Sequence, residues 1–298
     1  MKKILLFSSI CKPVEILKVS LPSYLALNKQ GFELDILFYD DNKEVESSDY
    51  LKELSQQQKN VKLLDNFELS KNEYQDHNWS PSQINRIITI KNYAIDYCVA
   101  NNYDSLFLVD SDLVLHPNTL VHLLSLKLDF VFEVFWTLFF RQAIHKPNAW
   151  DKHSWAYKGP ETLIKLKTAG TYEVGGGGAC TLLSNRIMKD GVNFNRLKSL
   201  PYQGEDRHIC THAQAKDFRI MVDTFYPAYH IFSQDQIQEA KEWYENGAKR
   251  EFFDNWLDER WKSLVYNTFN VKKLTFLEKL KKFQYTIRIN FIRIFTHD

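Results

Sequence analysis

A short apolar run that ends in two acids constrains this chain of 298 residues more than any other stretch. Leu106–Val109 has the length and composition of a buried strand in a parallel sheet. Asp110-Ser111-Asp112 follows at once, and apolar residues resume at Leu113. If the backbone stays extended, both carboxylates point to the same side. Burying two such charges without partners would be costly, so they are either solvated in an ordinary polar turn or neutralised by a cation.

The order of elements predicts that this strand belongs to an α/β sheet. Strand patterns at 3–9 and 32–39 flank a helical pattern at 14–29, and such a βαβ unit implies parallel strands. Ligands bind beyond the carboxyl ends of strands in these sheets, which makes Asp40, at the end of the second strand, a candidate nucleotide contact. Because neither G-x-G-x-x-G nor a Walker A loop is present, dinucleotide oxidoreductases and P-loop kinases are disfavoured.

A helical pattern at 83–100 leads into the central strand and carries two basic residues of interest. Arg86 and Lys91 lie on or near its polar side, where they either face an anionic ligand or form a solvated helix face. The remaining strand patterns lie at 61–64, 130–137, 179–183 and 218–225. The irregular stretch at 139–171 is assigned to an acceptor-side wall or lid.

Four consecutive glycines, Gly175–Gly178, form the second informative stretch. They permit positive φ and the close approach of a ligand to the backbone, and Gly176 and Gly177 are the candidate contacts. A flexible loop without a ligand is the alternative. A P-loop is disfavoured because no Lys-Ser/Thr pair follows the glycines.

Two acids and several histidines form the third group of candidates. Glu205 and Asp206 open a predicted helix, where the helix dipole alone would favour acids. A carboxylate there could also act as a general base if it lay about 3 Å from a hydroxyl. His208 and His212 have a spacing that can bind metal, but the absence of H-E-x-x-H disfavours a zinc site. His230 follows the last predicted strand.

Taken in order, these motifs resemble the glycosyltransferases of the GT-A fold, most of all the family-2 type, over residues 3–232. The resemblance implies a Rossmann-like α/β fold with a mostly parallel central sheet flanked by helices. It also implies that Asp112, assisted by Asp110 and His230, holds Mn²⁺ or Mg²⁺, cations that take oxygen ligands and accept phosphate oxygens. In that family the ion binds the diphosphate of a nucleotide sugar.

The resemblance further assigns roles in donor binding and catalysis. Donor binding falls to Asp40, Arg86, Lys91, Asp110, Ser111, Gly176 and Gly177. Asp206, with Glu205 as the next candidate, would remove the proton of an acceptor hydroxyl. The implied reaction moves a sugar from a nucleoside-diphosphate sugar, with UDP favoured, to a saccharide or glycoconjugate hydroxyl with inversion. Surface polysaccharide or glycoconjugate synthesis is the expected setting.

Three other readings stay open. A retaining transferase of the same fold would differ only in product stereochemistry. A nucleotidyltransferase that makes the sugar nucleotide would carry a loop rich in glycine and basic residues after the first strand, and 8–13 contains no glycine. A non-catalytic sugar-binding protein is the third.

Composition bounds partners and location. A formal net charge of +1 gives no general field for nucleic acid, and four scattered cysteines without C-x-x-C favour reduced thiols in a cytoplasm. No apolar run is long enough for a signal peptide or a membrane span.

We expect a catalytic domain over 1–232 and a helical extension over 233–298. The basic, apolar-rich tail at 272–297 would contact the inner face of the membrane or pack on protein.

Overall fold

The computed structural model describes residues 1–64, 80–137, 145–152, 165–198, 200 and 204–254. Met1–Asn255 form one compact unit. The basic tail and most of the predicted acceptor-side wall lie outside the described residues. Over the part that is described, no helix is both long and apolar enough to cross a membrane.

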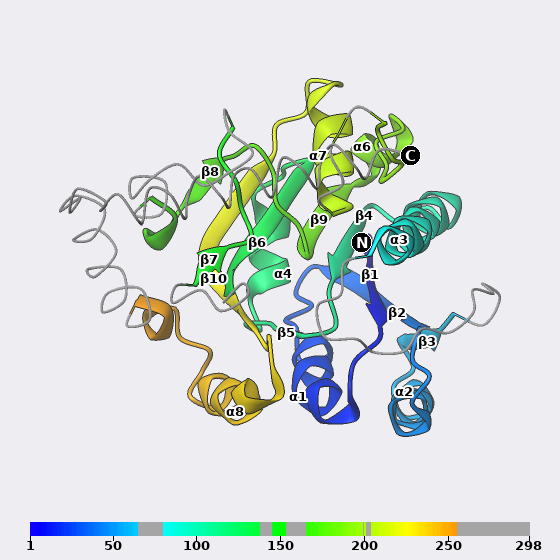
Figure 1. Ribbon diagram of the computed structural model, residues 1–298, viewed down its shortest axis with the longest axis vertical. Coiled ribbons are helices and arrows are strands. Elements are labelled where there is room, and N and C mark those ends of the chain that lie inside the picture. The colour runs from blue at the N-terminus through cyan, green and yellow to red at the C-terminus, as the bar shows by residue number, and fades with distance from the viewer. Residues whose placement is uncertain (65–79, 138–144, 153–164, 199, 201–203, 255–298) are drawn as a thin grey trace, which may run out of the picture. The chain divides into compact units, whose positions relative to one another are not determined.

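The described residues form a ten-stranded mixed sheet flanked by helices (Figure 1). The strands are β1 (Lys2–Ile10), β2 (Phe32–Asp40), β3 (Val61–Leu63), β4 (Ser105–Val109), β5 (Leu113–Val114), β6 (Phe130–Thr137), β7 (Lys146–Pro147), β8 (Thr171–Glu173), β9 (Cys180–Ser184) and β10 (Met221–His230). The helices are α1 (Val14–Leu25), α2 (Val45–Gln57), α3 (Pro81–Ala100), α4 (Thr119–Ser125), α6 (Asn185–Lys189), α7 (Asp206–Gln214), the 3-10 helix η1 (Gln234–Gln236) and α8 (Ile237–Glu245).

The strand order is β3-β2-β1-β4-β9-β6-β10-β5, with β7 on β6 and β8 on β10. The first four strands are parallel, and β6 pairs in parallel with β10. Between these two groups β9 runs antiparallel to both of its neighbours. The expected α/β class, with a mostly parallel central sheet and flanking helices, is therefore confirmed. The antiparallel strand within it was not predicted.

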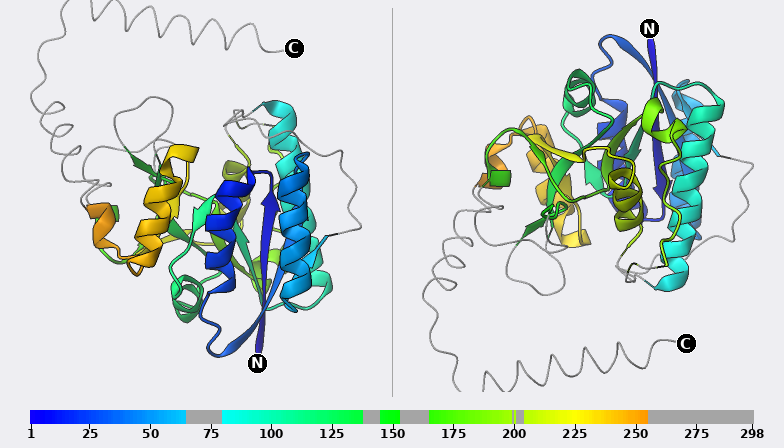
Figure 2. Two further views of the ribbon diagram at one scale, coloured as in Figure 1. Left: turned by 90° about the horizontal axis from the view of Figure 1, so that it is seen from below. Right: turned by 90° about the horizontal axis from the view of Figure 1, so that it is seen from above.

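Apolar faces of the helices bury both sides of the sheet. On one side α1, α2 and α4 contribute Leu17, Leu51 and Leu120 to a core that includes Phe107 of β4. In Figure 1, α1 and α2 lie below β1–β3 and α3 lies above. The left view of Figure 2, seen from below, shows α1 to the left of β1 and α2 to its right. Each fully buried leucine contributes about 1.5–3 kcal/mol, so these faces fix the order of the strands and the edge where they end.

Helix α3 begins where its sequence supplies a cap. The hydroxyl of Ser80 accepts a hydrogen bond from the Gln83 N–H at 3.3 Å, and the Gln83 side chain accepts one from the Ser80 N–H at 3.2 Å. Pro81 occupies the first turn, where its missing N–H costs nothing. This capping box starts the helix two residues before the predicted boundary and fixes the position of Lys91 further along it.

The sheet also buries an acid away from the strand ends. Glu133 of β6 is fully buried beside its register partner Asp223 of β10. Burial, followed by the charge of Asp223, raises the pKa of Glu133 well above its usual value. The folded chain therefore keeps a proton that the unfolded chain releases near pH 4.3.

This retained proton predicts a pH-dependent stability difference between the native chain and Glu133→Gln. Above about pH 4.3 the native chain should lose stability relative to the variant, by up to about 1.4 kcal/mol per pH unit, until Glu133 ionises in the folded state. Urea unfolding of both proteins between pH 5 and 7 measures the difference. The exposed Glu53 on α2 provides the control, Glu53→Gln. Parallel stability curves would contradict the prediction.

Candidate functional site

Asp110, Ser111 and Asp112 form a tight turn between β4 and β5, beyond the carboxyl ends of β1, β2 and β4. The Leu113 N–H donates to the Asp110 carbonyl at 3.2 Å. The backbone is thus not extended, so the condition for both carboxylates to point to one side is not met. Each carboxylate instead has its own partners.

Helix α1 holds this turn from below. The buried hydroxyl of Tyr24 donates to the Asp110 carbonyl at 2.7 Å, and that of Ser20 donates to the Ser111 carbonyl at 2.7 Å. Both hydroxyls come from the helix face that packs under the sheet. Because the bonds go to backbone carbonyls, they fix the turn and leave the two carboxylates available for other contacts. Ser111 itself is buried.

Asp112 lies between two cationic or ionisable partners. Its Oδ2 atom is 2.7 Å from Lys12 Nζ and 3.3 Å from His230 Nε2. The antiparallel pair of β5 and β10 places His230 opposite Leu113, next to Asp112. Burial opposes ionisation, but Lys12 and His230 outweigh it and hold the pKa of the Asp112 carboxyl well below its usual range.

The donor atoms here fit a hard divalent cation. His230 Nδ1 lies 2.7 Å from the Thr137 hydroxyl, and this contact orients Nε2 toward Asp112. Carboxylate oxygen and imidazole nitrogen are both ligands of Mn²⁺. Nevertheless, no group of three or more His, Cys, Asp or Glu side chains in the described ranges is gathered tightly enough to hold a metal. The three predicted ligands lie near one another but are not assembled.

Lys91 is the centre of a second group of charges. Its ammonium lies 2.7 Å from Glu205 Oε1 and 3.6 Å from both Asp110 Oδ1 and Asp206 Oδ1. Lys91 is 6% exposed, so it belongs to the protein interior and not to a solvated helix face. Burial opposes its charge, but the three carboxylates outweigh this and raise the pKa of Lys91 well above its usual value. Lys91 thereby joins the Asp-Ser-Asp turn to the start of α7.

Asp206, at the start of α7, has a carboxyl whose pKa is shifted by its neighbours. Burial, with Glu205 and Asp110 adding to it and Lys91 opposing it, raises the pKa of Asp206 to about 7. Its side chain is still 29% exposed, so a substrate can reach it. The backbone of Gly178 packs directly against this carboxylate, and a Cβ at position 178 would collide with it. Gly178 therefore permits the close approach of the segment before β9 to Asp206.

The two glycines predicted to contact a ligand have internal neighbours. A Cβ on Gly176 would meet the ring of Trp150, and one on Gly177 would meet the ring of Phe132. Trp150 also pairs with Gly176 as a β-bridge, in which the backbone N–H of Trp150 donates to the Gly176 carbonyl at 2.9 Å. Packing against aromatic rings thus explains these glycines without a ligand.

Arg86 and Asp40, which were predicted to contact a nucleotide, bond to other residues of the chain. Arg86 forms a bidentate ion pair with the buried Asp41, whose carboxylate accepts from Arg86 Nε. Asp40 accepts hydrogen bonds from the backbone and side-chain N–H groups of Asn42 at 3.1 and 2.9 Å. In this structure Arg86 therefore lies against Asp41, and Asp40 stabilises its own turn.

The histidine pair on α7 does not face a common point. His208 Nδ1 accepts from the Leu197 N–H at 3.1 Å, and His212 Nε2 lies 2.9 Å from the Asn195 carbonyl. Both rings secure the segment before α7. The four cysteines form no disulfide with one another.

Sequence reasoning missed three residues of the site: Lys12, Asp41 and Gly178. Lys12 had a usable signal, because it is the one charged residue between Lys3 and Glu15 and it lies just beyond the end of β1. The other two had none, since an acid in a turn and a fourth glycine in a run carry no information about their neighbours.

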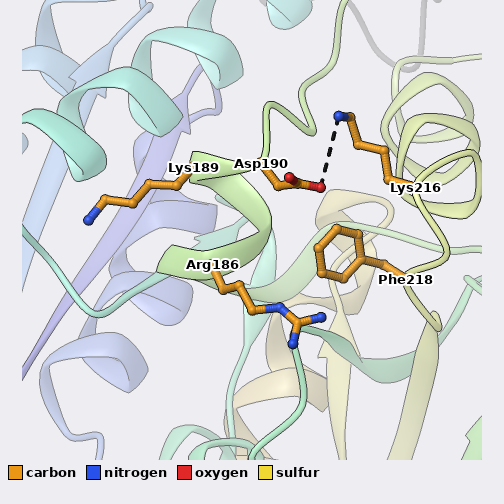
Figure 3. Close-up of a pocket in the computed structure, with 5 residues that line it drawn as sticks. All are labelled: Arg186, Lys189, Asp190, Lys216 and Phe218. Atoms are coloured by element: carbon orange, nitrogen blue, oxygen red, sulfur yellow. Dashed lines mark ion pairs between the residues drawn. The ribbon is translucent and has the colours of Figure 1, made fainter.

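A pocket on another part of the surface does not share these residues. It is lined by Arg186, Lys189, Asp190, Lys216 and Phe218, as Figure 3 shows. The Arg186 guanidinium lies 5.0 Å from the centre of the Phe218 ring, and Lys216 pairs with Asp190 at 3.9 Å. Because its cations are exposed, it lacks the buried charge of the strand-end site.

No protein-family model matches the chain, and no curated protein matches it. Among solved structures, A197 from STIV is similar at 14% identity, covering 77% of this chain and 85% of that one, with a TM-score of 0.42. S. aureus TarS 1–349 is 14% identical over 94% of this chain and 77% of that one, with a TM-score of 0.46. Its complex with UDP is 16% identical over 77% and 60%, with a TM-score of 0.45.

Removing the central ammonium should destabilise the fold. Lys91→Met leaves Glu205, Asp110 and Asp206 without the buried charge that balances them, and breaking such a pair costs about 3–5 kcal/mol. Urea unfolding at neutral pH measures the loss. Lys18→Met, an exposed position on α1, should change stability by less than about 0.5 kcal/mol. A similarly small loss for Lys91→Met would show that the carboxylates do not depend on it.

Proposed function

We propose that the chain is a glycosyltransferase that moves a sugar from a nucleoside-diphosphate sugar to an acceptor hydroxyl. The observation that carries the proposal is the joining of two acidic segments, the Asp-Ser-Asp turn and the Glu205-Asp206 start of α7, through the buried Lys91. This juxtaposition lies beyond the carboxyl ends of parallel strands, where ligands bind in open α/β sheets.

Asp206 has the role of general base in this proposal. It takes the proton of the acceptor hydroxyl while that oxygen bonds to the anomeric carbon of the sugar, and the bond from this carbon to the diphosphate oxygen breaks. A pKa of about 7 suits a base that works at neutral pH. Gly178 and Lys91 set the position of the carboxylate on two sides.

Asp112, Asp110 and His230 are the residues that would hold Mn²⁺ or Mg²⁺. A bound divalent cation would offset the negative charge of the leaving nucleoside diphosphate. The half-exposed Asp110 side chain supports this assignment, since it lies between the Lys91 group and solvent with 41% of its surface exposed. His230 contributes a ring nitrogen already directed at Asp112.

When the acceptor oxygen displaces the diphosphate in a single step, the configuration at the anomeric carbon inverts. The proposal further takes a UDP-sugar as donor and a saccharide or glycoconjugate as acceptor, in the synthesis of surface polysaccharide or glycoconjugates. A cytoplasmic location at the inner face of the membrane belongs to the same proposal. Residues 272–297, on which membrane contact would depend, lie outside the described residues.

Calorimetric titration tests the donor half of this proposal. The protein is titrated with UDP, GDP, ADP and CDP, each with and without Mn²⁺. We expect one of the four nucleoside diphosphates to bind. Its affinity should fall at least tenfold when Mn²⁺ is removed or in Asp112→Asn, because the diphosphate charge is then less well balanced. A folded protein that binds none of the four would overturn the proposal.

Replacing Asp206, the proposed general base, should reduce sugar transfer without reducing nucleotide binding. Asp206→Asn should keep nucleoside-diphosphate binding within about threefold and lose at least about 100-fold in sugar transfer, because general-base catalysis contributes about 10²–10⁴. In the native protein transfer should fall about tenfold per pH unit below pH 7, as Asp206 takes up a proton. Transfer and its pH profile are measured as release of nucleoside diphosphate in the presence of an acceptor. An unchanged rate in Asp206→Asn would exclude this residue as the base.

A further inference from the structure

Lys12 lies where a divalent cation would have to bind. Its ammonium is 2.7 Å from Asp112 Oδ2, the same oxygen that His230 Nε2 approaches at 3.3 Å. The backbone of Lys12 is fixed at both ends: its N–H donates to Asn42 Oδ1 at 2.9 Å, and its carbonyl accepts from the Ser47 hydroxyl at 3.0 Å. The position of this loop is therefore set by residues outside the site, and the side chain reaches Asp112 from a fixed base.

An ammonium and a divalent cation cannot both remain on one buried carboxylate oxygen. Like charges repel more strongly where little water screens them, and a doubly charged ion would be repelled more strongly than a singly charged one. Asp112 is 6% exposed, so water screens this repulsion little. Binding of a cation to Asp112 Oδ2 therefore requires Lys12 to move, unless a new anion arrives between the two charges.

We propose that Lys12 competes with the divalent cation for Asp112 and is released onto the diphosphate when the nucleotide binds. This inference rests on the proposed function, because a diphosphate is the anion that would accept the displaced ammonium. Lys12 thus makes the metal and the nucleotide bind together. It accounts for ligands that lie close to one another without forming an assembled metal group among the described residues.

Mn²⁺ binding to the protein without nucleotide tests the proposal. The fraction of free Mn²⁺ is measured by electron paramagnetic resonance for the native chain, Lys12→Met and Lys12→Gln. We expect both variants to bind Mn²⁺ at least about tenfold more tightly than the native chain, since the competing charge is gone. Lys12→Gln keeps a hydrogen-bond donor for Asp112, so it serves if Lys12→Met does not fold. Lys18→Met is the matched control on the exposed face of α1.

Two further measurements complete the test. Adding Asp112→Asn to Lys12→Gln should abolish the tighter binding, which locates it at Asp112. With Mn²⁺ present, Lys12→Gln should bind UDP about tenfold more weakly than the native chain, because the diphosphate loses a cationic partner. Variants that bind Mn²⁺ no more tightly than the native chain, or the absence of Mn²⁺ binding in every variant, would overturn the proposal.

The UDP titration keeps this outcome separate from the function itself. If the native chain binds UDP while the Lys12 variants bind Mn²⁺ like the native chain, the competition is wrong and donor binding stands. If the native chain binds no nucleoside diphosphate at all, the proposed function fails, and the proposed role of Lys12 fails with it.

Discussion

The buried ammonium of Lys91 is the contact on which the arrangement of the strand-end residues depends. Placing Asp110, Glu205 and Asp206 around one point would be unfavourable without a cation, because like charges repel strongly where little water is present. Lys91 supplies that cation from α3 and makes its shortest contact, 2.7 Å, with Glu205. Three elements that are distant in sequence are joined by it: the helix before β4, the turn after β4 and the start of α7.

Local sequence patterns predicted most of the sheet. Phe130–Thr137 was predicted with its observed bounds, because a run of apolar and β-branched residues interrupted only by Glu133 has few alternatives to a buried strand. The strands that became β1 and β2 were predicted to within about a residue. The boundaries that moved were set by contacts the pattern does not contain, such as the cap that Ser80 and Gln83 give to α3. The direction of β9 could not be predicted either, because the sequence pattern of a strand is the same for parallel and antiparallel pairing.

The candidate site was predictable as a set of residues but not as a set of pairs. The acids of the Asp-Ser-Asp turn and of α7 were identified by their position beside strands and glycines. Their partners were not, because Lys91 and Glu205 are separated by 114 positions and nothing local records the contact. Arg86 shows the same limit: a basic residue on a helix was expected to meet a phosphate, and in the structure it meets the carboxylate of Asp41.

The pairing of β5 with β10 has a consequence for the order of folding. Asp112 acquires His230 only when the last strand of the sheet docks beside β5, and Lys91 acquires Glu205 only when α7 is in place. Contacts of such long sequence separation form after local ones, because closing a long loop costs entropy before the contact can repay it. As the chain leaves the ribosome, its N-terminal half therefore carries Lys91 and Asp110 while Glu205 and Asp206 are still unsynthesised. The site becomes complete only after nearly the whole sheet has formed.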